Sequence, residues 1–489
     1  MRLDRHLALA AALFALATPA PAATFLVTST ANAGPGSLRQ ALIDAGSATT
    51  APHLIVFDAA YPQGGVITLQ SPLPTWSNDM LEINGGGRQP VIDGNGTQRI
   101  LSFSTTSRQI TLNGLTLRRG RSTSGAGGCL WLAPGVTNTD LYVFNSRFEQ
   151  CIARGNYASA YGGAISWDSQ DATVFIYDSQ FTGNAAGVVG NSSLKQSLGG
   201  AIQIRARRIE LLRSRFTGNS VERIGGEVQA LGGAAYLIAS FRILARDVEF
   251  RDNAVIDANG TGTISAGGAA TLVCEDSDCG LYLENAGFID NKITGQQIGG
   301  GALATSGAIT IDNVSFHGNQ APGGNGGALL ALTGSISARH LSFFDNGAAV
   351  GAHLSMSGMD VDRWAWSLVG ASSAGSGSAC ELYSSSLTGS LSANLFAQDC
   401  GLLSASGGVI GPVGALTLDS NTFPASLVPG AGSPAIDPAL PLGDCYTFND
   451  AIGTPRPQDG DGDGVARCDI GAVEVRPAAV FSDGFEGNP

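Results

Sequence analysis

The chain has 489 residues, a formal net charge of −13 and only 14% charged residues, whereas glycine alone accounts for 68 positions. An acidic chain of this kind is repelled by nucleic acid, and glycine without a three-residue period excludes collagen. Beyond its first residues the sequence never approaches the roughly 18 unbroken apolar residues of a membrane-spanning helix, so we expect no such helix.

Residues 1–22 have the layout of a secretory signal peptide. Arg2 and Arg5 precede an apolar run that ends at Ala17, and the small residues Ala20 and Ala22 follow it. Because a charged start, a short apolar run and a small-residue cleavage site direct export, we expect a secreted protein that is extracellular or associated with the outer surface.

Residues 23–60 predict a cap for the N-terminal end of the fold. A strand around Phe25 and Val27 leads to a Gly-Pro-Gly turn, after which Ser37 is suited to N-cap a short helix. Leu38, Ala41 and Leu42 fall on one side of that helix, which can therefore cover an apolar surface.

Residues 61–425 contain a repeat that opens with a glycine pair and closes on Phe-x-x-Asn. The pair occurs seven times, at Gly127-Gly128, Gly162-Gly163, Gly199-Gly200, Gly232-Gly233, Gly267-Gly268, Gly300-Gly301 and Gly326-Gly327. The phenylalanines are Phe148, Phe181, Phe216, Phe250, Phe288, Phe316 and Phe343, and an Asn stands three residues after each one except the first, where Cys151 takes its place. Two motifs that recur in a fixed order predict a stack of similar units.

Within each copy, apolar residues alternate with polar ones before the Phe and after the glycine pair. A two-residue period predicts strands with one buried face, and an Asn or Asp such as Asn145 or Asp178 marks the corner between them. One copy cannot bury its apolar side alone, so we expect copies to stack with parallel pairing and ladders of Phe on Phe and Asn on Asn. The Asn after the Phe is expected to occupy a left-handed turn. The predicted fold class is all-β, a single-stranded right-handed parallel β-helix solenoid with a cap at each end.

Eight cysteines in an exported chain predict disulfides. They fall into four local pairs, namely Cys129/Cys151, Cys274/Cys279, Cys380/Cys400 and Cys445/Cys468. Local pairing is the simplest connectivity, and a Cys129–Cys151 bridge would clip one coil shut because the two positions flank its variable loop.

Residues 426–475 are expected to form a disulfide-clipped C-terminal cap, with residues 476–489 as a tail. Asp459, Asp461 and Asp463 alternate with glycine like the first half of a calcium-binding EF-hand loop. The twelfth position of that motif is Ile470 rather than Glu, so Asp469 or Glu474 would have to complete a calcium site. The alternative is a solvated acidic turn without a cation.

A basic segment interrupts the acidic chain. Ten Lys and Arg residues stand against five acids between Lys195 and Arg251. The candidate ligand-binding residues are Arg205, Arg207, Arg208, Arg213 and Arg215. Their charge suits an anionic glycan or another anionic cell-surface component. The alternative is that the arginine stems only shield strand edges.

Several segments resemble secreted proteins of known families. Gly36-Ser37-Leu38-Arg39-Gln40-Ala41 is similar to the N-terminal segment of CSLREA-type bacterial β-helix proteins, and the repeats resemble those of chlamydial polymorphic outer-membrane proteins. The segments Ser433–Asp437, Pro455–Pro457 and Cys468–Ala472 with Glu474 resemble the C-terminus of the choice-of-anchor Q group, although Asn449–Ile452 departs from its usual Asp-Gln-Arg-Gly. The tail around Phe481 and Phe485 resembles one found on secreted proteins of some gammaproteobacteria. These resemblances imply export and a pectin-lyase-like β-helix.

The sequence favours a non-enzymatic, adhesin-like protein that binds glycans or other surface ligands. The alternative is a polysaccharide lyase or glycoside hydrolase acting on an acidic polysaccharide, which needs clustered carboxylates with a basic group, or paired aspartates near Gly-His-Gly. The sequence has no Asp-Asp pair, no Gly-His-Gly and no Arg-Ile-Lys, and the position of His317 holds unrelated residues in the other copies, so we name no catalytic residue. An enzyme of this class would instead show outward carboxylates of adjacent coils converging with an Arg or Lys in a groove.

Overall fold

The structure is a computed structural model. It describes residues 23–476 apart from 105–107, 157–158, 190–194, 224–228, 258–263, 295–298, 374, 406–407 and 440–444. The expected signal peptide, residues 1–22, and residues 477–489 of the expected tail lie outside the described residues.

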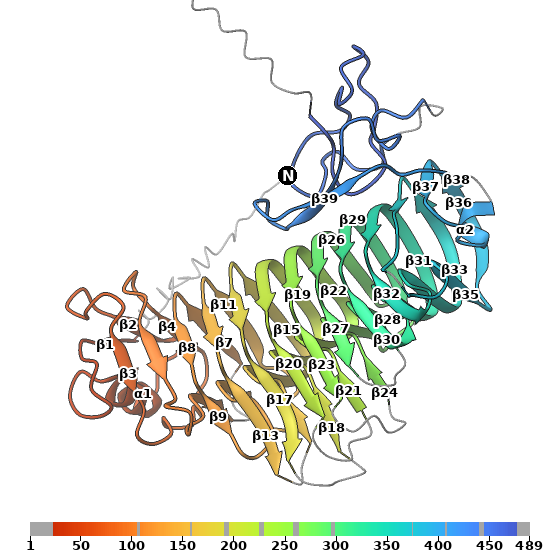
Figure 1. Ribbon diagram of the computed structural model, residues 1–489. Helices are drawn as coiled ribbons and strands as arrows, with labels where there is room; N and C mark the ends of the chain where they lie inside the picture. The colour runs from red at the N-terminus through yellow and green to blue at the C-terminus, as the bar shows by residue number, and fades with distance from the viewer. Residues whose placement is uncertain are drawn as a thin grey trace, which may run out of the picture.

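The protein is all-β, as predicted, and its repeat copies stack side by side along one axis (Figure 1). We call the strands that one copy contributes a rung. Neighbouring rungs pair in parallel, and the register follows the sequence repeat, with Ile165 opposite Ile202, Val174 opposite Ile209 and Phe181 opposite Phe216. The repeat therefore sets the pairing, because a slip of one residue would turn each buried side chain outward.

Strands of the first rungs form the start of the largest sheet. They are β1 (Ala23–Val27), β2 (His53–Phe57), β3 (Val66–Thr68), β4 (Leu81–Asn84), β5 (Val91–Asp93), β6 (Leu101–Phe103), β7 (Gln109–Asn113) and β8 (Thr116–Arg118).

The same sheet continues through the repeats. Its strands there are β10 (Leu130–Leu132), β11 (Asp140–Phe144), β12 (Arg147–Glu149), β15 (Ile165–Tyr177), β16 (Gln180–Thr182), β19 (Ile202–Thr217), β22 (Ala235–Arg251), β25 (Ala270–Cys274), β26 (Gly280–Ile289), β28 (Leu303–Ser306), β29 (Ala308–His317), β31 (Leu329–Phe344), β33 (Leu354–Ala365) and β34 (Leu368–Val369). In β15, β19 and β22 the two strands expected per copy run together as one bent strand, with a bulge where β15 pairs β19 and where β19 pairs β22.

Two smaller sheets form the rest of the wall. One contains β9 (Arg121–Ser122), β13 (Ile152–Asn156), β17 (Ala185–Val189), β20 (Ser220–Arg223), β23 (Ala254–Asp257), β27 (Lys292–Thr294), β30 (Gln320–Asn325) and β32 (Gly347–Val350). The other contains β14 (Ala160–Tyr161), β18 (Gln196–Leu198), β21 (Gln229–Leu231) and β24 (Ile264–Ala266). The glycine pair lies where this second sheet meets the largest one. Gly162 has φ 54°, and a Cβ on Gly163 would lie 2.2 Å from the carbonyl oxygen of Gly200 in the next rung.

Two ladders fill the interior. The seven phenylalanines stack with ring centroids 4.7 to 5.1 Å apart. The Oδ1 of each motif Asn after the first accepts two hydrogen bonds, for example that of Asn253 from the backbone N–H and the Nδ2 of Asn219. The Oδ1 of the first, Asn184, accepts from the backbone N–H of Cys151. The expectation that this Asn itself adopts the left-handed conformation was wrong. That conformation belongs to the preceding residue, such as Gly218 or Asp252, because the Asn must point inward to reach its neighbours.

The N-terminal cap agrees with the sequence. Helix α1 (Leu38–Ser47) begins after Ser37, whose side chain accepts a hydrogen bond from the backbone N–H of Gln40. Its buried side includes the expected Leu38, Ala41 and Leu42, and it packs on β1 and β2.

The far end of the stack is made of β35 (Cys380–Tyr383), β36 (Ser386–Ser392), β37 (Asn394–Phe396), α2 (Leu402–Ala405) and β38 (Gly408–Ile410). An antiparallel hairpin of β39 (Leu416–Asp419) and β40 (Ser426–Pro429) follows.

The segment that we expected over the C-terminal end lies instead along the flank of the stack (Figure 1). We call residues 413–439 and 445–476 the strap. The backbone N–H of Ala425 donates to Glu249, that of Leu427 to Ser315 and that of Ala472 to Ser342. Leu416, Leu427 and Ile470 pack with Trp366 and Leu368 in an apolar cluster. Flanking rungs thus supply an apolar surface and hydrogen-bond acceptors that the strap needs.

Candidate binding grooves

An aromatic groove opens where the glycine-pair corner brings two sheets together. It has a volume of about 480 Å³, and its lining includes the three rings of Trp131, Tyr161 and Tyr236. Polar side chains of the lining are Ser124, Ser159, Ser166, Asp168, Gln196, Gln203 and Arg205. Aromatic faces with a few fixed polar groups are the usual composition of a ligand site.

Arg99 holds one wall of the aromatic groove in place. Its guanidinium lies 4.5 Å from the centre of the Trp131 ring and donates to the hydroxyl of Ser124 and the carbonyl of Ala126. Burial lowers the pKa of Arg99 to about 10, which still leaves the side chain charged at neutral pH. The ring and the wall beside it are therefore fixed before any ligand arrives.

Asp168, Arg205 and Glu275 form a charged group at the aromatic groove. Arg205 donates to both carboxylate oxygens of Glu275, at 2.8 and 3.3 Å. Asp168 pairs in register with Arg205, one rung away. Partial desolvation raises the pKa of the Asp168 carboxyl, the charge of Arg205 opposes that rise and the charge of Glu275 adds to it.

The five predicted arginines do not form one free cationic surface. Arg205 lies in the aromatic groove, whereas Arg213 and Arg215 line a different hollow with Phe423 of the strap. Arg207 stacks on Phe241, 4.7 Å from the ring centre. The other four make ion pairs, Arg205 with Glu275, Arg208 with Glu210, Arg213 with Asp178 and Arg215 with Glu249. An anionic ligand would have to displace these carboxylates.

A second groove, which we call the corner groove, runs along the line that the strap follows. Its volume is about 610 Å³, and its floor includes Val91, Thr116, Arg147 and Gln180 from four successive rungs. The same row of positions continues as Arg215, Glu249, Gly287, Ser315 and Ser342, which the strap covers or borders. The strap therefore fills the later part of this row and leaves the earlier part open.

The acidic loop differs from the predicted calcium ligands. Asp459 and Asp461 come together with Asp437, and one oxygen of each lies within 4.8 Å of the others. Asp463 instead pairs with Arg467, 2.9 Å away. Asp437 was missed because it lies 22 residues before Asp459, outside any local calcium motif.

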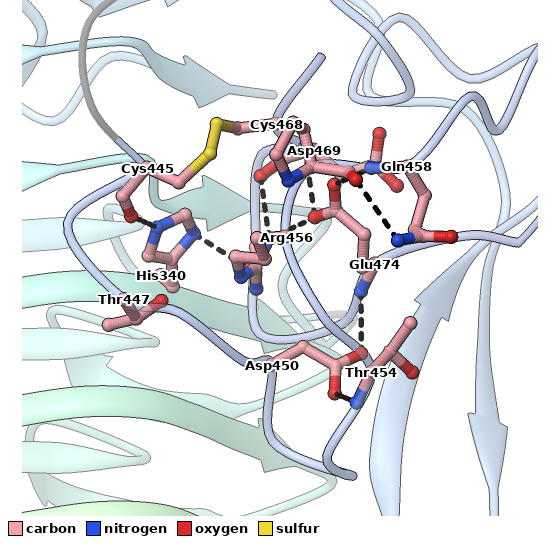
Figure 2. Close-up of polar contacts among 12 residues, drawn as sticks. His340, Cys445, Thr447, Asp450, Thr454, Arg456, Gln458, Cys468, Asp469 and Glu474 are labelled. Atoms are coloured by element: carbon pink, nitrogen blue, oxygen red, sulfur yellow. Dashed lines mark hydrogen bonds and ion pairs between the residues drawn. A yellow bond between two sulfur atoms is a disulfide. The ribbon is translucent and has the colours of Figure 1, made fainter. Parts of the chain in front are cut away.

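Asp469 and Glu474, which we considered as further calcium ligands, point into the strap instead (Figure 2). Glu474 forms a fully buried ion pair with Arg456, and it also accepts the backbone N–H of Gln458 and of Asp469. Asp469 accepts from the backbone N–H of Asp437 and of Val475. Burial, with the nearby charge of Glu474, raises the pKa of Asp469 to about 7.

His340 connects this network to the stack. Its Nε2 lies 2.5 Å from the carbonyl oxygen of Cys445 and its Nδ1 lies 3.2 Å from that of Gly471, both in the strap (Figure 2). Burial and the charge of Arg456 hold the pKa of His340 well below its usual value. Both ring nitrogens face carbonyl oxygens of the strap, and a neutral ring can donate a hydrogen bond to one of them only. His340 is therefore a structural contact of the strap rather than a free base.

All four expected cysteine pairs form disulfides, Cys129–Cys151, Cys274–Cys279, Cys380–Cys400 and Cys445–Cys468. Disulfides of this number are typical of proteins in oxidising compartments. Among the residues described, no helix has the length and apolar character needed to cross a membrane.

The aromatic groove was missed from the sequence. Trp131 and Tyr236 each stand three residues after the second glycine of a pair, at a position that faces outward. The repeat pattern gives no reason to single that position out. The signal available was the aromatic character of two of these outward positions.

Comparison with known proteins gives no relative: no family model, no curated protein and no solved structure matches the chain.

Proposed function

We propose that the stack is a right-handed parallel β-helix of the pectin-lyase-like kind and that the protein is exported by residues 1–22. Parallel pairing of successive rungs, the internal Phe and Asn ladders and four disulfides support this proposal. So do the resemblances of the repeats and of both ends to secreted β-helix proteins.

We further propose that it is a non-enzymatic, adhesin-like binding protein whose aromatic groove holds a glycan. The observation that carries the proposal is the convergence of Trp131, Tyr161 and Tyr236 with amide and hydroxyl side chains in one hollow. A sugar ring has an apolar C–H face, which packs on an aromatic ring, and a polar edge, which such side chains can hydrogen-bond.

The ligand that fits best is an uncharged glycan. Arg205 is the predicted arginine in the aromatic groove, and Glu275 already neutralises it. Asp168 adds a carboxylate to the lining. An anionic sugar would meet these carboxylates, whereas a neutral sugar can use them as hydrogen-bond acceptors.

A glycan array followed by calorimetric titration with neutral oligosaccharides tests this proposal. The Trp131→Ala variant should bind an array hit at least about tenfold more weakly, because it loses the ring that Arg99 holds in the wall. Tyr282→Ala is the matched control, since Tyr282 also lies under an arginine, Arg242, but outside the groove. Equal binding by wild type and Trp131→Ala would reject the groove as the site.

A polysaccharide-cleaving enzyme is the second candidate. Asp168, Arg205 and Glu275 bring two carboxylates and a basic group together from different rungs, as such an enzyme requires, and the raised pKa of Asp168 suits a general acid. Release of reducing ends or unsaturated products from a polysaccharide, lost in Asp168→Asn, would establish the enzyme and reject the binding protein.

Calcium remains a proposal for the acidic loop, with Asp437, Asp459 and Asp461 as its ligands. Carboxylate oxygens are ligands that calcium prefers, and a chelator removes calcium from such a site. Adding calcium to chelator-treated protein should raise the melting temperature, and Asp461→Asn should abolish that rise. A melting temperature that calcium leaves unchanged would reject the site.

A further inference from the structure

The residues that the structure describes only partly cover the last apolar layer at the C-terminal end of the stack. Leu382, Leu387 and Leu391 continue inward columns whose previous members, Met356, Val361 and Trp364, are fully buried. The three leucines pack on the core but are only partly buried. The strap does not cover them because it docks along the flank.

The strands that carry these leucines are edge strands. Of the described strands, only β33 pairs with β35 and β36, so one side of each is open. β36 reads Ser-Leu-Thr-Gly-Ser-Leu-Ser, without the charge or proline that natural edge strands often carry to prevent pairing, although a bulge at Thr388-Gly389 interrupts its pairing with β33. The residues on either side of this bulge are a template for another strand.

Exposed apolar side chains surround this edge. Tyr383 is 69% exposed, Val409 52% and Ile410 55%. The segment at α2 seals only part of the end, where Leu403 and the Cys380–Cys400 disulfide are buried. We call Tyr383, Leu382, Leu387, Leu391, Val409 and Ile410 the end face.

The opposite end of the stack is closed. Helix α1 lays its buried Leu38, Ala41, Leu42 and Ala45 against β1 and β2. A head-to-tail chain of molecules would require both ends to be open, so this cap prevents it. Self-association of this chain through the end face therefore joins two like ends.

We propose that the end face binds the end face of a second copy, with the two β36 strands pairing antiparallel across a two-fold axis. β36 itself carries no charge, so two copies can pair through this strand without like-charge repulsion between the pairing strands. Each leucine of one copy then faces the leucine-lined end of the other, which continues the apolar core across the interface. The product is a closed dimer in which both rods point outward. This proposal is independent of what the aromatic groove binds.

Sedimentation velocity of the exported chain, residues 23–489, across a wide concentration range tests the proposal. Wild type should show a monomer–dimer equilibrium. Leu387→Glu and Leu391→Glu should each raise the dissociation constant at least about tenfold, because they bring carboxylates together across the two-fold axis. Phe241→Glu is the control, since Phe241 is an exposed apolar residue that is not part of the end face, and it should leave the equilibrium unchanged. Unchanged circular dichroism and melting temperature confirm that each variant is folded.

A second variant separates the two possible occupants of the end face. A chain that ends at Arg476 should dimerise like wild type. Dimerisation that appears only after this truncation would mean that residues 477–489 cover the end face in the intact chain, and it would overturn the proposal. A wild type that stays monomeric, or a dimer that both glutamate variants leave intact, would also overturn it.

Discussion

At the scale of single residues, the interior depends on one amide per rung. The Oδ1 of Asn253 accepts from both the backbone N–H and the Nδ2 of Asn219, and its own Nδ2 donates to the carbonyl of Phe216 and to Asn291. Asn253 is fully buried, so no water can replace it. Asparagine suits the position because one side chain supplies the acceptor and the donor that connect three rungs.

Asn253→Ala should destabilise the protein by about 3 kcal/mol, because it leaves two buried donors of Asn219 without an acceptor. Urea unfolding measures the change in the free energy of unfolding. Gln196→Ala is the comparison, since the Gln196–Gln229 pair is only partly buried, and its cost should stay below about 1 kcal/mol. Equal costs for the two variants would contradict the role of the Asn ladder.

Asp469 should make the stability of the strap depend on pH. Its pKa is raised to about 7 in the folded protein from an ordinary 3.8, so between these values the folded state holds a proton that the unfolded state has lost. Stability from this group is therefore present at low pH and is lost as pH rises from about 4 to 7. Glu474 acts in the same direction, whereas His340, with its lowered pKa, removes stability below about 6.5.

Asp469→Asn isolates this contribution. The variant cannot ionise, so its free energy of unfolding relative to wild type should rise as pH increases from about 4 to 7 and then stay level. Chemical unfolding at several pH values, with proteolytic cleavage of the strap as the readout, measures the difference in the free energy of unfolding between the variant and wild type. A difference that is the same at every pH would show that Asp469 does not titrate in this range.

At the scale of elements, the strap needs a glycine in the strand beneath it. Gly287 lies in β26, and a Cβ at this position would lie 2.5 Å from the carbonyl oxygen of Ala425. The neighbouring rungs offer Glu249 and Ser315 as acceptors for the strap backbone. Position 287 therefore allows close approach, and the positions on either side supply hydrogen bonds.

Gly287→Val should displace the strap while the rungs stay folded. The expected result is cleavage between residues 420 and 430 at least about tenfold faster in limited proteolysis, because the added side chain occupies the space of the Ala425 carbonyl. Gly411→Ala is the control, since a Cβ there meets nothing within 4 Å. Unchanged cleavage of the valine variant would show that the close contact does not hold the strap.

At the scale of the whole molecule, each rung contacts its neighbours through equivalent residues. Ile152 pairs with Ala185 in the next rung, as Ala185 does with Ser220. Because stability in such a stack is a sum of rung and nearest-neighbour terms, a complete rung can be removed without changing the register of the others.

Deletion of residues 152–184 should therefore give a folded, cooperatively melting protein whose long dimension is shorter by about 4.8 Å. Small-angle scattering and thermal melting check this outcome. Deletion of residues 152–167, which removes about half of the unit, should aggregate because β9, β17 and β18 lose the strands that pair with them. A folded half-unit deletion would contradict the repeat as the structural unit.

The sequence by itself determined the repeating features, which are the parallel rungs, the Phe and Asn ladders and the corners at Asn145 and Asp178. Seven copies reveal which positions stay apolar. The sequence also determined two features that a local pattern is enough to place, the α1 cap and the four disulfides. Tertiary structure alone decided how distant, non-repeating segments meet. It brought Asp437 to Asp459, and it gathered Trp131, Tyr161 and Tyr236 in one groove. It also paired Arg205, Arg213 and Arg215 with carboxylates of other rungs. Tertiary structure also placed the strap on the flank rather than on the end. The strap packs on apolar residues of the rungs and approaches the backbone closely at Gly287, and no local sequence pattern describes these surfaces.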